Sequence, residues 1–313
     1  MRGAAVLGLG AHRPAVRQDN LAIAERTGSS DEWIRTRSGI ATRGVAGDDE
    51  SVVDMAVSAG GKALAAAGRT GADVGLVLLA TCSMPGPLPG GSPEVAYRLG
   101  ATAAGASDIG AGCAGFTYAL ALAADAVRAG SADTVLVVGS EKLLPMVDPD
   151  DRGTAFLFGD GAGAAVVGVA DVDTIGRVVW ANDGDQADRL VIEGSPLRLR
   201  MDGRGIYRWA TTSLPDLARR ACTAAGIEPA DLAAFVPHQA NLRITESVVK
   251  SLGLPSSVVV ARDVVDSGNT SAASVPLALT RLQEQGAIRT GDPVLLLGFG
   301  AGLTAAGCVV HCP

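Results

Sequence analysis

Short runs of uninterrupted apolar residues recur along this chain of 313 residues and constrain its fold more than any other feature. The runs 74–80 (VGLVLLA), 134–139 (TVLVVG) and 293–298 (PVLLLG) lack the polar alternation of a strand with one face in water. Such strands are buried on both faces, which requires helices on both sides of a sheet. Strand-like runs also occur between helical segments at 4–9, 164–169, 233–236, 258–261 and 307–311. This alternation predicts an α/β architecture.

The second half of the chain weakly repeats the first. The segment 66–80 resembles 224–238 at an offset of 158 residues, and 133–139 resembles 292–298 at an offset of 159. Three similarities in nearly one register, the third pairing 119–120 with 278–279, predict that one α/β unit is duplicated. We expect an N-terminal half at 1–170 and a C-terminal half at 171–313, with corresponding loops meeting at a pseudo-twofold axis.

One cysteine stands in the setting of a nucleophile. In DIGAGCAG (108–115), a short run that we expect to be a buried strand leads into a glycine turn around Cys113. An Ala-rich helix is expected from Phe116 to about Val127. Cys113 would then lie near a helix N-terminus, where free N–H groups and the helix dipole favour a thiolate. The alternative is a small core residue, as most free cysteines are.

Composition excludes several classes of protein. The net charge of −7 argues against broad nucleic-acid binding, and no run reaches the roughly 18 apolar residues of a membrane span. The five cysteines are scattered and odd in number, and no secretory signal is recognised, so we expect a cytoplasmic protein. On a strand, Cys308 and Cys312 would share one face with His311 on the other, so we expect no metal site there.

Three further loops follow candidate strands and carry polar or glycine-rich segments. They contain His238 in PHQAN (237–241), Asn269 in GNTS (268–271) and Ala301 in FGAG (299–302). Open α/β sheets place ligands at such strand ends, so a thiol, an imidazole and a carboxamide there form a candidate catalytic set. Taken alone, His238 fits a structural histidine equally well, and Asn269 fits a turn or helix cap.

The glycines around Cys113 also suggest a competing function. Gly110, Gly112 and Gly115 match the dinucleotide-binding pattern, and Glu141 ends the next strand, where it would contact a ribose. The strand that leads in is short, and a cysteine occupies the position that would face the ligand. Two other segments, 159–164 and 300–305, match the pattern too, so it is weak in this glycine-rich chain. A dinucleotide-dependent oxidoreductase stays an alternative at this stage.

Several long motifs, taken together, resemble β-ketoacyl-acyl carrier protein synthase III. They are GCAGFTYAL (112–120), DRGTAFLFGDGAGAAVV (151–167), VPHQANLRI (236–244), GNTSAASVP (268–276) and GFGAGLTAAG (298–307), and the segment 29–43 fits as well. The motifs are long, occur in order and span nearly the whole chain. The resemblance implies a five-layered αβαβα thiolase fold built from two duplicated halves, and a homodimer.

The resemblance also assigns roles to residues at the matching positions. It implies a catalytic triad of Cys113, His238 and Asn269, with the backbone N–H groups of Cys113 and Ala301 as an oxyanion hole. The family usually has glycine at the position of Ala301, but a backbone donor tolerates alanine. The resemblance implies that Arg243 contacts the acidic acyl carrier protein. The implied contacts to coenzyme A are Trp33, which would stack on adenine, and Arg37, Arg152, Gly153, Ile206 and Asn241.

Asn269 bears on the reaction, because related enzymes have histidine or aspartate at this position. Asparagine favours a condensation in which an acyl-coenzyme A acylates Cys113 and malonyl-acyl carrier protein then condenses with loss of carbon dioxide. No metal or redox cofactor is implied. The alternative is transfer of the acyl group from Cys113 to an oxygen or nitrogen nucleophile.

Two segments depart from the family pattern. The segment 82–93 is unusually rich in proline and glycine, and Thr304-Ala305 stands where many members have Thr-Trp. In the family, the first segment helps to shape the primer pocket across the dimer. Both departures predict a specialised acyl primer, as in a polyketide or other secondary pathway.

Overall fold

The computed structural model describes residues 2–313, whose strands form two five-stranded sheets. The first sheet has the strand order β1 (Gly3–His12), β7 (Gly161–Ala170), β6 (Thr134–Glu141), β4 (Leu76–Ala80) and β5 (Gly105–Ile109). The second has the order β8 (Val179–Asn182), β14 (Thr304–His311), β13 (Pro293–Gly300), β11 (Ala234–Pro237) and β12 (Val259–Val260). Two ribbons lie outside the sheets: β2 (Val16–Asp19) with β3 (Thr42–Val45), and β9 (Leu190–Glu193) with β10 (Arg198–Met201).

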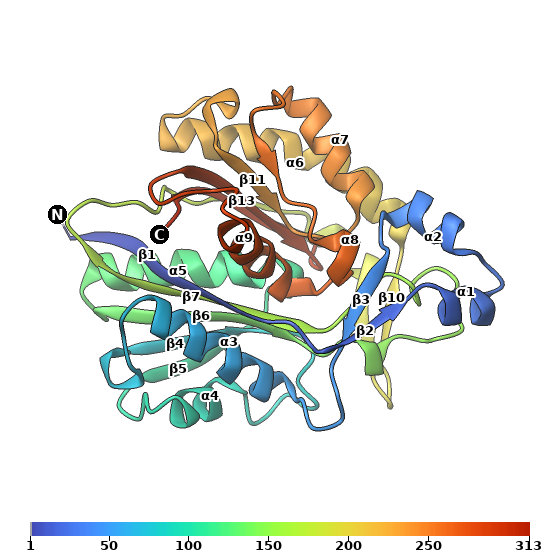
Figure 1. Cartoon of the computed structure of the whole chain (residues 1–313), viewed down its shortest axis with the longest axis horizontal. Coiled ribbons are helices and arrows are strands. Elements are labelled where there is room, and N and C mark those ends of the chain that lie inside the picture. The colour runs from blue at the N-terminus through green and yellow to red at the C-terminus, as the bar shows by residue number, and fades with distance from the viewer. Residues whose placement is uncertain (1) are drawn as a thin grey trace.

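Three layers of helices alternate with the two sheets (Figure 1). The middle layer, between the sheets, holds α5 (Gly115–Ala129) and α9 (Ser274–Glu284). The outer layers are α3 (Val52–Ala66) with α4 (Ser92–Arg98) on the first sheet, and α6 (Gly203–Ala225) with α7 (Leu242–Leu252) on the second. The short helices α1 (Leu21–Thr27) and α2 (Asp31–Ser38) lie at one end, and α8 (Val264–Ser267) lies further in, beside β3. The predicted five-layered α/β architecture is confirmed.

The two sheets share one topology. In each, the first strand pairs antiparallel with the second and the second with the third, whereas the third, fourth and fifth run parallel. Helices α5 and α9 begin at residues 115 and 274, which is the offset of 159 found in the sequence. The predicted duplication is therefore seen in strand order, strand direction and helix register.

Small residues let the layers pack closely, which explains how a chain with 4% aromatic residues fills its core. A Cβ atom on Gly139 of β6 would lie 2.4 Å from the carbonyl oxygen of Ala272, and one on Gly163 of β7 would lie 2.8 Å from the backbone nitrogen of Leu277. Larger residues at these strand positions would push the start of α9 away from the first sheet.

The strand that precedes Cys113 differs from expectation. It is predicted to be buried, and this is wrong: β5 is an edge strand, with Gly105 and Ser107 exposed, because no strand within residues 2–313 covers its outer side. At the C-terminus, Cys308 is buried and His311 is exposed, as the strand pattern predicts. No helix within residues 2–313 has the length and apolar character needed to span a membrane.

Candidate active site

Cys113 lies in the middle of a 3-10 turn, η2 (Gly112–Ala114), between β5 and α5. Gly112 has a φ of 49°, a left-handed conformation that favours glycine. Burial raises the pKa of the Cys113 thiol to about 12; a hydrogen bond with Ser271 opposes this shift and the Glu141 carboxylate adds to it. The resting thiol is therefore protonated at neutral pH, because desolvation outweighs the thiolate-favouring helix start expected from the sequence.

His238 directly follows β11, and its ring is held from two sides. Its Nδ1 lies 2.6 Å from the hydroxyl oxygen of Ser274, and the ring of Phe299 meets the imidazole edge-on at 4.9 Å between centroids. The backbone N–H of His238 donates to the carbonyl oxygen of Leu297 at 2.7 Å, which joins the loop to β13. Burial lowers the pKa of His238 to about 3, so the imidazole is neutral.

Asn269 lies on the segment that leaves α8. Its backbone bonds in both directions to the segment 157–159: its N–H donates to Leu157 at 2.8 Å, and its carbonyl accepts from Gly159 at 3.1 Å. Its side-chain Oδ1 accepts a hydrogen bond from the backbone N–H of Ser271 at 2.8 Å. Because the oxygen is occupied in this way, the NH2 group is the free end of the carboxamide.

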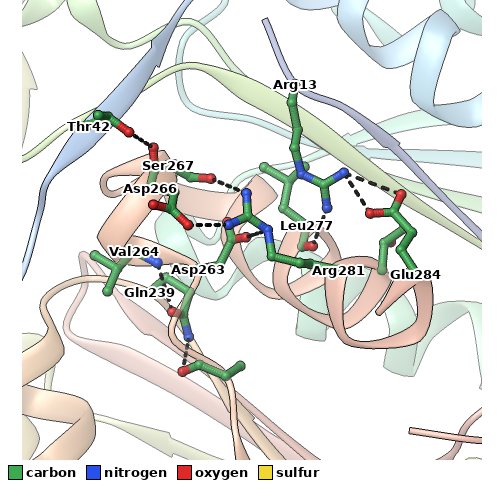
Figure 2. A network of polar contacts seen from close by, with 12 residues as sticks. Arg13, Thr42, Gln239, Asp263, Val264, Asp266, Ser267, Leu277, Arg281 and Glu284 are labelled. Atoms are coloured by element: carbon green, nitrogen blue, oxygen red, sulfur yellow. Dashed lines mark hydrogen bonds and ion pairs between the residues drawn. The ribbon is translucent and has the colours of Figure 1, made fainter. Parts of the chain in front are cut away.

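Two ion pairs of Arg281 hold the helix that precedes Asn269 (Figure 2). Arg281 on α9 lies 2.6 Å from a carboxylate oxygen of Asp263 and 2.8 Å from one of Asp266, on either side of the first residues of α8. Asp263 is buried and Asp266 is exposed. Arg281 therefore ties α8, and with it the approach to Asn269, to the middle helical layer.

Gln239 joins the loop of His238 to the same helix (Figure 2). Its side-chain oxygen accepts from the backbone N–H of Val264 at 3.1 Å, and its side-chain nitrogen donates to the carbonyl of Pro237 at 2.7 Å. The side chain is fully buried. The sequence analysis did not select Gln239 or Arg281, because their partners are distant in the sequence or are backbone atoms.

The three residues of the predicted triad line one cavity. Cys113, His238 and Asn269 all contact a cavity of about 790 Å³. They come from three separate loops, two of them in the second half of the chain. The structure therefore brings together the thiol, the imidazole and the carboxamide that the sequence analysis selected.

Most of the residues predicted to contact coenzyme A line the same cavity. Two guanidinium groups lie over the ring of Trp33, that of Arg37 at 4.6 Å and that of Arg152 at 4.8 Å from the ring centroid. Arg152 does not itself line the cavity, but it lies over the ring of Trp33, which does. The remaining predicted residues that line the cavity are Gly153, Ile206, Asn241 and Arg243.

Asn241 also has a structural task. Its side-chain Oδ1 accepts from the backbone N–H of Arg243 at the start of α7, and its Nδ2 donates to the carbonyl of Arg37 at 3.0 Å. Both ends of the carboxamide are thus used within the protein. Two basic residues of α6, Arg204 and Arg208, line the cavity as well and were missed. The basic spacing in GRGIYR (203–208) was the available signal.

A second, smaller cavity reaches Cys113. It has a volume of about 310 Å³ and includes Thr81, Cys82, Ser271 and Ala301. Its apolar lining is Leu143, Phe158, Leu190, Val191, Ile192 and Leu199. The β9–β10 ribbon supplies four of these six side chains. Thr304 and Ala305 line neither of the two cavities.

The dinucleotide-binding interpretation is wrong. Glu141, the expected ribose contact, is fully buried, and its carboxylate accepts from the Thr81 hydroxyl at 3.1 Å and the Cys82 backbone N–H at 3.1 Å. A Cβ on Gly115 would lie 2.9 Å from that of Ala80, so this glycine admits another part of the protein and not a pyrophosphate. Among residues 2–313, no three His, Cys, Asp or Glu side chains gather as they would around a metal ion.

Two family models match the chain: 3-oxoacyl-[acyl-carrier-protein (ACP)] synthase III over residues 107–184 and its C-terminal region over residues 222–312. The chain is 51% identical to beta-ketoacyl-[acyl-carrier-protein] synthase III 4 of Streptomyces coelicolor, with 100% of this chain and 99% of the relative covered. The chain belongs to the β-ketoacyl-acyl carrier protein synthase III family. A synthase III of Mycobacteroides abscessus is 46% identical, with 98% of this chain and 94% of the relative covered.

Solved structures of the family have the same fold. A priming β-ketosynthase from a polyketide biosynthetic pathway superposes with a TM-score of 0.97 at 44% identity, covering 100% of this chain and 97% of that one. The synthase III of Aquifex aeolicus gives 0.93 at 35% identity, with 99% and 100% covered. The predicted thiolase fold and ketoacyl synthase III enzyme class are confirmed, and the alternative of simple acyl transfer is not favoured.

Proposed function

We propose that this enzyme condenses an acyl-coenzyme A primer with malonyl-acyl carrier protein, with Cys113, His238 and Asn269 as its catalytic residues. The observation that carries the proposal is that these side chains open on one cavity, and that a second, apolar cavity begins at Cys113. A thioester that enters through the first cavity would reach the thiol, and its acyl chain would occupy the second.

In the first half-reaction, the sulfur of Cys113 attacks the carbonyl carbon of the primer thioester. The bond between that carbon and the coenzyme A sulfur then breaks, and the thiol proton of Cys113 ends on the departing coenzyme A. The backbone N–H groups of Cys113 and Ala301 are our candidates for stabilising the tetrahedral oxyanion. The placement of Ala301 supports this role, since a Cβ on Gly112 would lie 3.4 Å from its backbone nitrogen.

In the second half-reaction, the malonyl thioester loses carbon dioxide and becomes an enolate. Hydrogen bonds from His238 and from the Asn269 NH2 group would stabilise the negative charge on the enolate oxygen. The enolate carbon attacks the acyl-cysteine carbonyl, the β-ketoacyl thioester leaves on the carrier protein, and Cys113 takes up a proton. These steps use two thioesters and the side chains named here, so the proposal requires no metal or redox cofactor.

The mouth of the larger cavity suits a nucleotide and an acidic carrier. We propose that Trp33, Arg37 and Arg152 bind the adenine and phosphates of coenzyme A, and that Arg243 contacts the carrier protein. Gly153, Ile206 and Asn241 would border the pantetheine arm. For an enzyme with a net charge of −7, a local group of arginines supports recognition of an acidic partner.

A homodimer follows from the same proposal. Among the described residues, one side of the edge strand β5 pairs with no other strand, and the side chains of Leu88 and Tyr97 are 86% and 73% exposed. Burying such an edge and its apolar neighbours against a second copy would stabilise both subunits. Segment 82–93 carries Leu88 and starts at the smaller cavity through Cys82, which supports a role in primer choice. Sedimentation analysis tests the dimer.

Two further assignments belong to the proposal. We place the enzyme in the cytoplasm, since its five cysteines are free thiols, which suits a reducing compartment. We also place the boundary between the halves after residue 170, where β7 ends.

Intact-protein mass spectrometry tests the nucleophile. After mixing with an acyl-coenzyme A, the enzyme should gain the mass of the acyl group, and Cys113→Ala should not. Addition of malonyl-acyl carrier protein should then discharge the acyl group with release of carbon dioxide. An adduct that persists in Cys113→Ala, or discharge without carbon dioxide, would contradict the proposal. Cys222→Ala, at another buried cysteine, is the matched control.

A further inference from the structure

We propose that Ser274 is a positioning residue that fixes the tautomer of His238, so that the imidazole presents its Nε2–H group to the reacting thioester. This inference rests on the function proposed above. Ser274 is the first residue of α9 and is fully buried. His238 belongs to the loop after β11, so the contact joins two elements that are separate in the sequence.

The hydroxyl group of Ser274 has two polar neighbours. The backbone N–H of Gln239 donates to its oxygen at 3.2 Å, and Nδ1 of His238 lies 2.6 Å from it. The amide can only donate, so it uses a lone pair of the serine oxygen, and the hydroxyl proton needs an acceptor. Across residues 2–313, Nδ1 is the one acceptor that bonds to this hydroxyl. Ser274 therefore donates to Nδ1, and the proton of the neutral ring is on Nε2.

The hydroxyl of Ser274 is not used to cap its own helix. Ser274 lies in the first turn of α9, whose N-cap residue is Ala273, and within the described part of the chain no side-chain cap hydrogen bond is made there. A serine at a helix start commonly serves that local purpose. Here the hydroxyl is directed at the neighbouring loop instead, which indicates a role in orienting the imidazole.

The surroundings of the ring keep this arrangement in place. Phe299 packs edge-on against the imidazole, with an interplanar angle of 71°, and Gln239 fixes the loop on the other side. Nε2 makes no hydrogen bond within the described chain, and His238 lines the cavity that holds Cys113. The Nε2–H group is thus left free for a ligand.

Asn269 is fixed by the same principle. The backbone N–H of Ser271 occupies its Oδ1, as the hydroxyl of Ser274 occupies Nδ1 of His238. Each contact supplies a hydrogen to the acceptor atom and leaves the donor atom for the substrate. Without Ser274, the ring can carry its proton on Nδ1, and the lone pair on Nε2 would then face the negative enolate.

Nuclear magnetic resonance of the full-length chain labelled with ¹⁵N-histidine reports which ring nitrogen is protonated. The chain has three histidines, so His12 and His311 serve as internal references for an intact fold. The wild type should show the Nε2–H form of His238, and Ser274→Ala should add the Nδ1–H form. Thr280→Val, on the same helix, removes a buried hydroxyl that donates to the Pro276 carbonyl, and it should leave the His238 signals and turnover unchanged.

Kinetics provide the second measurement. Ser274→Ala should slow decarboxylation of malonyl-acyl carrier protein by roughly 10- to 100-fold, less than the loss of an oxyanion-hole donor itself. Acylation of Cys113 should stay within about two-fold, because the backbone donors assigned to that step are untouched. Ser274→Cys should recover part of the rate, since a thiol is a weaker donor of similar size.

The two measurements separate this inference from the proposed function. An Nδ1–H form of His238 in the wild type, or an unchanged tautomer in Ser274→Ala, overturns the role of Ser274. If the tautomer changes as expected but the wild type does not decarboxylate malonyl-acyl carrier protein, the proposed reaction fails while the assignment of Ser274 is supported.

Discussion

Gly112 and Ser271 have the same left-handed backbone conformation at equivalent positions of the two halves, with φ values of 49° and 46°. Each begins a three-residue 3-10 turn, η2 in the first half and η6 (Ser271–Ala273) in the second, that leads into a middle-layer helix. The central position of the turn is Cys113 in one half and Ala272 in the other. Duplication therefore built two similar turns, of which one carries the nucleophile and the other supports it.

Gly112→Ala should damage both stability and acylation. A Cβ at this position would lie 3.3 Å from that of Ala301, and the left-handed conformation disfavours any side chain. We expect the free energy of unfolding to fall by about 1–2 kcal/mol. Acylation of Cys113 should slow, because the turn presents the thiol and its backbone N–H to the thioester. Denaturant titration and time-resolved intact mass measure the two effects.

Gly110→Ala is the matched control for stability. Gly110 is exposed, and beyond its two chain neighbours no described residue comes within 4 Å of a Cβ built on it. Its free energy of unfolding should stay within about 0.5 kcal/mol of the wild type. Equal stability losses in the two variants would show that the conformation of Gly112 is not the source of the effect.

The sequence predicted the parts of the fold in which local pattern and tertiary environment agree. The runs at 134–139 and 293–298 are the strands β6 and β13 in the structure. Strands buried on both faces have an uninterrupted apolar pattern, so they can be recognised without knowledge of the rest of the fold. β5 was misjudged, since a sheet edge is defined by the absence of a neighbour and not by the residues of the strand. The offset of 159 predicted that the loops of Cys113 and Asn269 correspond.

Much of the supporting site was beyond sequence reasoning. Ser274 and Gln239 act through single hydrogen bonds to atoms on other loops, and no periodicity marks such a contact. The β9–β10 ribbon lines the same cavity as Cys113, although the two are distant in the sequence, so this contact depends on the tertiary fold. The expected preference of Cys113 for the thiolate form was also misjudged, because burial, which raises the pKa of the thiol, is a property of the packed layers.

The buried imidazole should make folding stability depend on pH. In the folded chain, burial lowers the pKa of His238 from 6.5 to about 3. Below about pH 6.5 the unfolded chain therefore binds a proton at this residue and the folded chain does not. Stability should fall as the pH drops from about 7 towards 4, and this residue should contribute a slope of up to about 1.4 kcal/mol per pH unit.

His238→Gln tests this prediction, because it removes the titrating group and keeps a polar side chain. Urea titrations across that pH range should give a flatter dependence for the variant than for the wild type. Identical slopes in the two proteins would mean that the imidazole takes up protons equally well in the folded chain.

The ion pair between Arg281 and Asp263 should matter for both folding and condensation. Asp263 is 3% exposed, and Asp263→Asn leaves the partly buried guanidinium without its closest partner. We expect a loss of about 3 kcal/mol in the free energy of unfolding. Condensation should be slowed more than acylation, because the affected helix leads to Asn269 and not to Cys113.

Glu284→Gln provides the comparison. Glu284 is on α9, as Arg281 is, and its half-exposed carboxylate forms an ion pair with Arg13 at 3.0 Å, which this substitution breaks. The expected cost is below about 1 kcal/mol, since solvent screens the pair. If both substitutions cost the same, the buried pair does not hold α8 more strongly than an ordinary surface contact.

The apolar cavity behind Cys113 should decide which primers are accepted. Its volume of about 310 Å³ and its largely apolar lining suit an acyl chain longer than acetyl, so a panel of acyl-coenzyme A thioesters should include longer or branched primers that acylate the wild type. Ile192→Phe places a larger side chain in this space. We expect kcat/KM for the longer primers to fall about ten-fold or more, while acetyl-coenzyme A is retained.

The conservative variant Ile192→Leu keeps the volume and should preserve the wild-type preference. Two results would contradict the assignment of this cavity. If Ile192→Phe rejected acetyl and longer primers alike, the ribbon would be affecting access to Cys113 and not chain length. If the wild type used acetyl-coenzyme A alone, this cavity would not be the site that accepts the primer chain.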